Sequence, residues 1–145
     1  MGCDASGVCT DPLTIFTYSQ SSLVASYAEQ QLIDAGVPTD ALRFVMLGAN
    51  PDAVPTDLYP TEVFNIDGDV FTNDSVQSWV DLLTGRTSWQ DLLLGLALHN
   101  AYLGLTPDQI DSATPVVDGM TTFNEIPTLT LPELWQALLS AMSNV

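Results

Sequence analysis

Apolar and polar positions alternate along the chain in segments that predict strands and helices in turn. Residues 13–18 (LTIFTY) are β-branched and aromatic, and residues 42–47 (LRFVML) form a nearly continuous apolar segment, as in a strand covered on both faces. Between them, apolar residues recur at helical spacing as far as Ala35, and Gly36 and Pro38 end the helix. Two strands joined by a helix predict a right-handed βαβ unit with parallel strands.

A turn signal predicts a β-hairpin after this unit. The dipeptide Asp67-Gly68 favours a tight type I′ turn, because both residues tolerate positive φ, and strands are expected on either side over residues 61–66 and 69–72. A capping-box pattern with apolar residues at helical spacing then predicts a helix over residues 74–85. The predicted order to this point is β-α-β-β-β-α.

The C-terminal part of the chain predicts helices around one irregular interval. A leucine-rich helix is expected over residues 89–103, a short helix begins at Thr106-Pro107, and a final helix covers residues 134–142. The interval 114–128 is interpreted as an extended loop or a weak strand.

These elements predict an α/β fold in three parts. Residues 1–12 form a leader, residues 13–85 form the β-α-β-β-β-α core, and residues 86–145 form a helical C-terminal extension that packs on the core. A chain of 145 residues suits one domain of ordinary size, and 46% hydrophobic residues predict a packed core.

The charge of the chain is strongly negative. Eighteen acidic residues face only Arg43 and Arg86, which gives a formal net charge of −16. Nucleic acids and anionic lipids are bound through many basic contacts, so neither is an expected partner. A halophilic or marine source, a surface built for solubility, and a wall past which DNA slides are three interpretations that the composition leaves open.

No signal peptide, membrane span or metal site is expected. The N-terminus has neither a basic start nor an apolar core, and polar residues interrupt the most apolar stretch, 89–105. Cys3 and Cys9 lie in the Gly/Ser/Asp-rich leader, where they either form a local disulfide or stay free. Two cysteines and the single histidine, His99, fall short of the four ligands of a zinc site.

The segment from Pro60 to Val70 (PTEVFNIDGDV) resembles part of the thioredoxin-like family. In that family a Pro-Thr pair precedes the third strand, and a Gly turn follows eight residues after the proline. The strand over residues 13–18, with its polar turn and helix, is similar to the family's first strand and active-site helix. The resemblance covers Leu13 to Gly85, and it implies that Pro60 is cis and faces the active site.

The family's redox motif is missing from this chain. Thioredoxins place Cys-x-x-Cys at the start of the first helix, where the helix N-terminus lowers the thiol pKa. Here Ser19, Ser21 and Ser22 occupy that region, and a serine hydroxyl cannot undergo thiol–disulfide exchange. Cys3 and Cys9 precede the first strand and do not replace the motif, so the resemblance implies a degenerate active-site region formed by these serines and Pro60.

The sequence carries no motif that indicates an enzyme. His99 is the single histidine that could act as a general base for the serines, and the chain lacks a G-x-S-x-G elbow. A lone helical histidine is more often a packed or surface residue, and Ser-His-Asp chemistry depends on geometry. The pair Asp67 and Asp69 is explained by the predicted turn. No phosphate or dinucleotide fingerprint occurs, and no cofactor is expected.

Apolar residues of the C-terminal helices are candidates for an interface: Trp89, Leu93, Tyr102 and Trp135. The other interpretation is that these helices pack on the sheet and on one another. The sequence therefore favours a non-catalytic structural or assembly protein that works as a homo- or hetero-oligomer. A virion component, such as an auxiliary capsid, connector or tail protein of a phage, is the specific hypothesis.

Other functions stay open beside it. One is a soluble thioredoxin-like redox or chaperone protein that uses Cys3 and Cys9, and another is a halophilic binding protein; both would be cytoplasmic rather than part of a virion.

Overall fold

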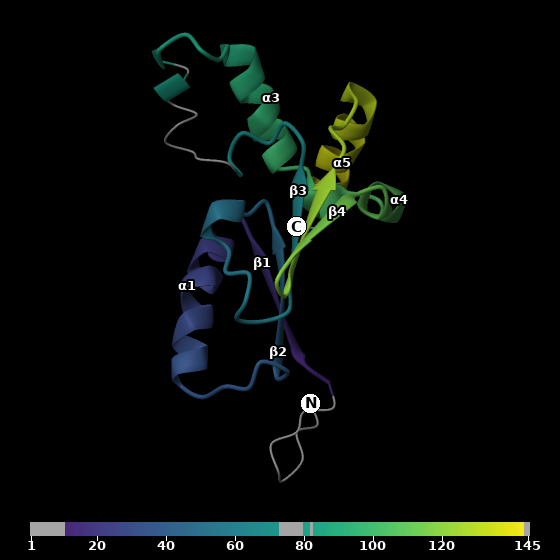
Figure 1. Ribbon diagram of the computed structural model, residues 1–145. Coiled ribbons are helices and arrows are strands. Elements are labelled where there is room, and N and C mark those ends of the chain that lie inside the picture. The colour runs from purple at the N-terminus through teal and green to yellow at the C-terminus, as the bar shows by residue number, and fades with distance from the viewer. Residues whose placement is uncertain (1–10, 73–79, 82, 144–145) are drawn as a thin grey trace.

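The computed structural model describes residues 11–72, 80, 81 and 83–143. It is a mixed α/β structure around one five-stranded sheet of order β1-β2-β3-β5-β4 (Figure 1). The strands are β1 (Leu13–Tyr18), β2 (Leu42–Leu47), β3 (Thr61–Ile66), β4 (Thr114–Asp118) and β5 (Thr121–Ile126). The helices are α1 (Gln20–Asp34), α3 (Trp89–His99), α4 (Pro107–Asp111) and α5 (Leu131–Ser143), with short 3₁₀ turns η1 (Pro51–Ala53) and η2 (Tyr102–Gly104).

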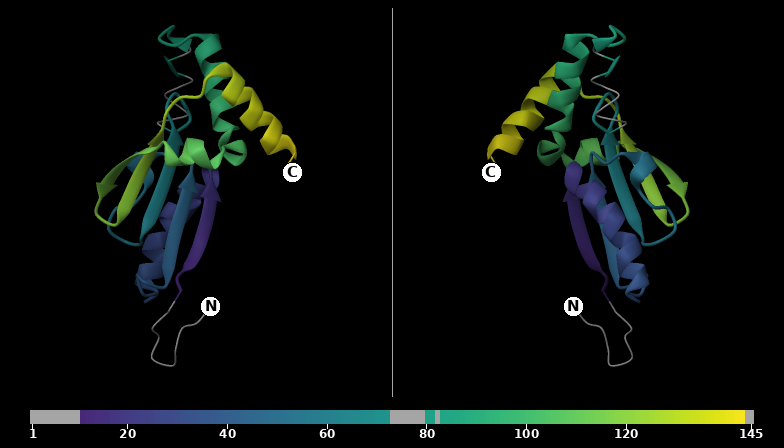
Figure 2. Two further views of the ribbon diagram at one scale, coloured as in Figure 1. Left: turned by 90° about the vertical axis from the view of Figure 1, so that its right-hand side faces the viewer. Right: turned by 90° about the vertical axis from the view of Figure 1, so that its left-hand side faces the viewer.

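The predicted βαβ unit is confirmed. Strands β1 and β2 are parallel, with Leu13 opposite Leu42 and Tyr18 opposite Leu47, and α1 covers one face of the sheet (Figures 1 and 2). Phe44, Met46 and Val63 alternate along the strands toward this face and are at most 1% exposed, which places the first hydrophobic core between α1 and the sheet.

The predicted hairpin at Asp67-Gly68 is wrong, although the turn itself is present. The amide of Asp69 donates to the carbonyl of Ile66 over 3.0 Å, and φ is positive at Gly68 but not at Asp67. A type I′ turn needs positive φ at both residues, and a turn with one positive φ at the second position does not match the twist of a hairpin. Residues 69–72 consequently form no strand, and β3 pairs in parallel with β5.

The hairpin of this fold lies instead in the interval interpreted as an extended loop or weak strand. Strands β4 and β5 are antiparallel, with Asp118 opposite Thr121, and Gly119 and Met120 connect them. Gly119 has φ 57° at the first loop position, as in a type II′ turn. A side chain at Gly119 would also meet the carbonyl oxygen of Thr56 at 2.1 Å, so only glycine fits there.

The C-terminal helices begin close to their predicted starts. Ser88 and Thr106 form capping boxes with Asp91 and Gln109. The side chain of Glu133 accepts from the amide of Thr130. A second core joins these helices to the carboxyl ends of β3 and β5: Ile66, Leu98, Ala101, Tyr102, Ile126, Leu129, Leu134 and Ala137.

The domain division at residue 85 does not match the sheet. Strands β4 and β5 belong to the segment 86–145, which was expected to be a helical extension, and β5 pairs with β3 along its whole length. The predicted helix over 74–85 lies largely outside the described residues, and the leader up to Thr10 lies outside them as well. Among the described helices, none is long and apolar enough to cross a membrane.

Candidate functional site

The turn between β1 and α1 holds Ser19 in an uncommon backbone conformation. Ser19 has φ 57° and ψ −126°, and within the described ranges it is the one residue other than glycine with positive φ. Such a conformation costs about 1–3 kcal/mol and is typical of functional turns. Ser19 occupies the N-cap position of α1, but its hydroxyl makes no capping hydrogen bond. The hydroxyl bonds elsewhere, to a residue eighty positions away.

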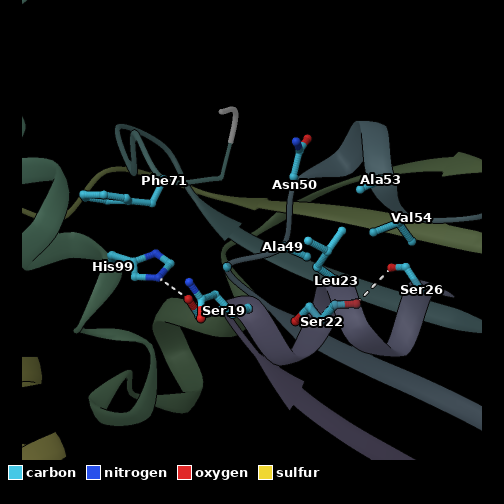
Figure 3. A pocket seen from close by; sticks show the side chains of 12 residues that line it. Ser19, Ser22, Leu23, Ser26, Ala49, Asn50, Ala53, Val54, Phe71 and His99 are labelled. Carbon is cyan, nitrogen blue, oxygen red and sulfur yellow. Dashed lines mark hydrogen bonds between the residues drawn. The ribbon is translucent and has the colours of Figure 1, made fainter. Parts of the chain in front are cut away.

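His99 is that partner. It is the last residue of α3, and its Nε2 lies 2.7 Å from the Oγ of Ser19 (Figure 3). Gly95 positions the helix, because a Cβ there would lie 2.6 Å from a methyl group of Val70. The missing side chain lets α3 cross close to the segment after β3, and this approach brings His99 to the carboxyl edge of the sheet.

Asp69 completes the arrangement on the other side of the imidazole. Its Oδ2 lies 2.8 Å from the Nδ1 of His99, and its side chain is completely buried. The amide of Phe71 donates to Oδ1 over 3.0 Å, and the hydroxyl of Tyr102 donates to Oδ2 over 3.0 Å. Asp69 follows the turn at the end of β3, so three segments of the chain supply one hydrogen-bonded series.

The chemistry of these groups defines the direction of the bonds. An ionised carboxylate only accepts, so Nδ1 of His99 carries a hydrogen toward Asp69 and Nε2 is left to accept from the hydroxyl of Ser19. Burial, with a contribution from the charge of Asp69, raises the pKa of the Tyr102 phenol, and the same two causes raise the pKa of Tyr18. Both phenols therefore stay protonated near neutral pH.

Aromatic rings enclose His99. Tyr18 stacks on it at 5.5 Å between ring centroids, Phe71 lies at 5.3 Å, and Tyr102 makes a T-shaped contact with it at 6.1 Å. The hydroxyl of Tyr18 donates to the carbonyl oxygen of His99. Gly48, at the end of β2, has φ 59°, and a Cβ there would lie 3.2 Å from the imidazole. The imidazole is thus fixed by ring packing as well as by hydrogen bonds.

A cavity of about 350 Å³ opens beside Ser19 and His99. Leu23, Val54 and Phe71 line it with apolar surface, and Ser22 and Ser26 add hydroxyl groups (Figure 3). Those hydroxyls are already bonded within the protein: Ser22 to Thr17 over 3.0 Å, and Ser26 to the carbonyl of Ser22 over 2.9 Å. The volume is that of a small-molecule site.

The residues expected from the thioredoxin-like resemblance do not gather at one place. Ser19 enters the hydrogen-bonded series, whereas Ser21 and Ser22 bond to β1. Pro60 directly precedes β3, at the amino end of the parallel strands, so it lies at the opposite end of the sheet from Ser19 and does not face it. The peptide bonds of the described residues are all trans, including that of Pro60. Cys3 and Cys9 lie outside the described residues.

The candidate interface residues divide into two groups. Trp89, Leu93 and Trp135 are 61–64% exposed on α3 and α5. Tyr102 is 3% exposed and bonded to Asp69, so it is part of the interior and not of the surface.

Sequence reasoning missed the combination of Ser19, Asp69 and His99. The local signal is the pentapeptide from Thr17 to Ser21, which has the form x-x-Ser-x-x with small residues where a G-x-S-x-G elbow has glycines. It lies at the junction of a predicted strand and a predicted helix, where such an elbow belongs. Asp69 carried no signal of its own, because a carboxylate beside a turn is ordinary.

The three residues form a Ser-His-Asp series of the kind used for acyl transfer. Comparison of the sequence with known proteins gives one similarity. The chain is 28% identical, over an alignment of 152 residues that covers 84% of it, to the uncharacterized PPE family protein PPE28 of Mycobacterium tuberculosis (strain ATCC 25618 / H37Rv). The chain spans 22% of the length of that relative. No protein-family model and no solved structure matches the chain.

Metal ligands are not gathered in the same way. The part of the chain that the structure describes contains no group of three or more His, Cys, Asp or Glu side chains arranged to hold a metal ion.

Proposed function

We propose that the chain is a serine hydrolase that cleaves small acyl esters, with Ser19 as nucleophile, His99 as general base and Asp69 as the group that orients His99. The observation that carries this proposal is the continuous series Ser19 Oγ–His99 Nε2, 2.7 Å, and His99 Nδ1–Asp69 Oδ2, 2.8 Å. Both distances lie within hydrogen-bond reach, the geometric requirement for an activated nucleophile.

The location of the three residues supports the same function. Ser19 lies on a strained turn between a strand and a helix, and the residues follow the chain in the order Ser, Asp, His. Both features are those of the nucleophile elbow and triad order of α/β-hydrolases. A strained backbone conformation at a residue other than glycine persists only where surrounding contacts stabilise it. At Ser19 such a contact is the hydrogen bond between its hydroxyl and His99.

The reaction follows from the bond directions. His99 Nε2 takes the hydroxyl proton as Ser19 Oγ attacks the ester carbonyl, and the imidazolium then gives that proton to the departing alcohol. A water molecule, deprotonated by His99, releases the carboxylic acid from Ser19 and restores the hydroxyl. The negative carbonyl oxygen of each intermediate needs donors, and α1 begins at Gln20, whose amide has no carbonyl partner within the helix.

The cavity indicates a small and uncharged substrate. Its volume of about 350 Å³ is at the small end of ligand sites, and its apolar side chains, Leu23, Val54 and Phe71, suit a short acyl chain. Neither arginine lines it: Arg43 pairs with Glu62, and Arg86 with Asp81. A substrate that carries a carboxylate or phosphate next to the ester would find no cation there and would meet a strongly acidic protein.

Covalent labelling tests the proposal directly. A fluorescent fluorophosphonate, which reacts with activated serines, is expected to label the wild-type chain and not Ser19→Ala, and the same substitution is expected to lower hydrolysis of 4-nitrophenyl butyrate by at least about 10³-fold. Ser112→Ala, which removes an exposed hydroxyl at the C-terminal end of α4, serves as the matched control and is expected to keep both signals. Equal labelling of wild type and Ser19→Ala, or no labelling of either, contradicts the proposal.

Exposed apolar stripes favour a second function, assembly through α3 and α5. Leu131, Trp135 and Met142 lie on one face of α5 and are 64–75% exposed. This is what the hypothesis of a structural protein with homo- or hetero-oligomeric partners requires. The thioredoxin-like relationship, the virion location and the halophilic or marine source stay predictions beside it.

Light scattering tests this second function, because it measures the mass of the particle in solution. An assembly through α5 predicts a mass of two or more chains, and Trp135→Ser is expected to shift it toward one chain because it removes the largest apolar group of the stripe. Val24→Ser, at a site 68% exposed on α1, is the matched control and leaves the mass unchanged. A single-chain mass for the wild type at the highest attainable concentration rejects assembly through this face.

A further inference from the structure

Tyr102 lies behind the proposed triad and shares an acceptor with it. Its hydroxyl donates to Oδ2 of Asp69 over 3.0 Å, and this is the oxygen that also accepts from Nδ1 of His99 over 2.8 Å. We propose that Tyr102 is a positioning residue that sets the basicity of His99 through Asp69; the inference rests on the proposed hydrolase function.

The structure fixes the phenol from both sides. The amide of Ile66, the last residue of β3, donates to the Tyr102 oxygen over 2.9 Å, so the hydroxyl hydrogen is directed to Asp69. The ring is 3% exposed within the second core. A Cβ at Gly48 would lie 3.1 Å from the Tyr102 ring and 3.2 Å from the His99 ring, so this glycine leaves room for both rings.

Three donors therefore hold one carboxylate in a single orientation. Phe71 occupies Oδ1 with its amide, while Tyr102 and His99 share Oδ2. Each donor to a carboxylate draws on its negative charge, so the hydroxyl of Tyr102 competes with His99 for Oδ2. Without the hydroxyl, Asp69 would stabilise the imidazolium more strongly and would be held less firmly in the plane that His99 requires.

Among the residues that the structure describes, the titratable side chains in contact with the imidazole are Asp69 from the segment after β3, Tyr102 from η2 and Tyr18 from the end of β1. Each of the two phenols can be removed separately, which makes the effect of Tyr102 separable. Tyr18 donates its hydroxyl to the main-chain oxygen of His99, and no hydrogen bond joins it to Asp69. Tyr18→Phe thus removes a phenol next to the same ring and leaves the carboxylate bonded as before.

The experiment uses the fact that His99 is the one histidine of the chain. Its ring resonances, followed by NMR as the pH is changed, report the pH at which half of the imidazole is protonated, and this readout does not depend on hydrolysis. Tyr102→Phe is expected to move that midpoint upward by about half a pH unit and to move the acid limb of kcat/KM for 4-nitrophenyl butyrate with it. It is expected to lower kcat about tenfold with little change in KM.

The controls separate this role from simple support of the fold. Tyr18→Phe is expected to leave the His99 midpoint within about 0.2 units of wild type. An unchanged midpoint in Tyr102→Phe, or an equal shift in both variants, overturns the inference even if the protein hydrolyses esters. Absence of hydrolysis in wild type, with the expected midpoint shift in Tyr102→Phe alone, rejects the hydrolase and keeps the link between Tyr102 and His99.

Discussion

If the chain is the proposed hydrolase, Asp69→Asn is expected to lower kcat for ester hydrolysis by on the order of 10⁴-fold, with little change in KM. The asparagine keeps the size of the side chain, but it can turn its NH₂ group toward Nδ1 of His99 and favour the imidazole form that carries hydrogen on Nε2. Nε2 then faces the hydroxyl of Ser19 as a donor and takes no proton from it. Steady-state kinetics of 4-nitrophenyl butyrate hydrolysis measure the effect.

Asp67→Asn is the matched control for this loss. Asp67 lies two residues earlier in the same turn, is exposed, and loses the same charge on substitution. We expect its kcat to stay within about twofold of wild type. A comparable loss in both variants would show that charge in the turn, and not the bond to His99, supports activity, and an Asp69→Asn enzyme with a tenth of the wild-type rate would refute the assigned role.

Glu29→Gln is expected to stabilise the protein at pH 8 by up to about 3 kcal/mol and to have little effect at pH 4. Glu29 lies on the buried face of α1 with no exposed surface, and neither carboxylate oxygen has a hydrogen-bond partner among the described residues. Burial raises the pKa of this carboxyl from 4.5 to about 7. Ionising it within the folded protein is therefore unfavourable compared with ionising it in the unfolded chain.

The direction of the pH dependence follows from this difference. Below pH 4.5 the carboxyl is protonated in both states, and its contribution to stability is fully present. Between pH 4.5 and about 7 the folded state holds more protons than the unfolded state, so the free energy of unfolding falls as the pH rises, and above about 7 the contribution is lost. Glutamine resembles the protonated side chain at every pH and removes the decline.

Denaturant unfolding of both forms at several pH values between 4 and 8 measures this difference. The exposed Glu125 provides the control, because Glu125→Gln removes one negative charge from the surface of β5. Its stability relative to wild type is expected to change by less than about 0.5 kcal/mol over the same range. A stability difference between wild type and Glu29→Gln that is equal at pH 4 and pH 8 would contradict the assignment.

The sequence predicted the elements that depend on neighbouring residues. The strands over 13–18 and 42–47 and the capped starts of the C-terminal helices arise from composition and spacing within a few residues, and the connection rule for a βαβ unit then gives the parallel pairing of the two strands. The β4-β5 hairpin also has a local signal, because Gly119 has the positive φ of its turn. The dipeptide Asp67-Gly68 is a stronger turn signal, and it led to the prediction of a hairpin at the wrong position. One dipeptide fits several turns, and only the pairing of the flanking strands distinguishes them.

The site itself depends on pairs that no local pattern records. Strand β3 pairs with β5, which places Thr61 opposite Thr121, sixty residues away. The hydroxyl of Ser19 is bonded to the imidazole of His99, eighty residues further along the chain. The histidine alone was ambiguous, because a helix end places it at the surface or in the interior depending on what the helix crosses. In the structure, the close approach of Gly95 to Val70 places His99 in a partly buried position, and this contact exists only in the folded protein.

The separation of the three site residues along the chain has a consequence for folding. Helices join residues close in sequence and can form early, whereas the bond between Ser19 and His99 closes a loop of 80 residues. The hydrogen-bonded series can exist only after α3 has docked against the turn that follows β3 and the start of α1. Catalytic competence would thus be among the last properties that this polypeptide gains as it folds, and among the first that it loses when its tertiary structure loosens.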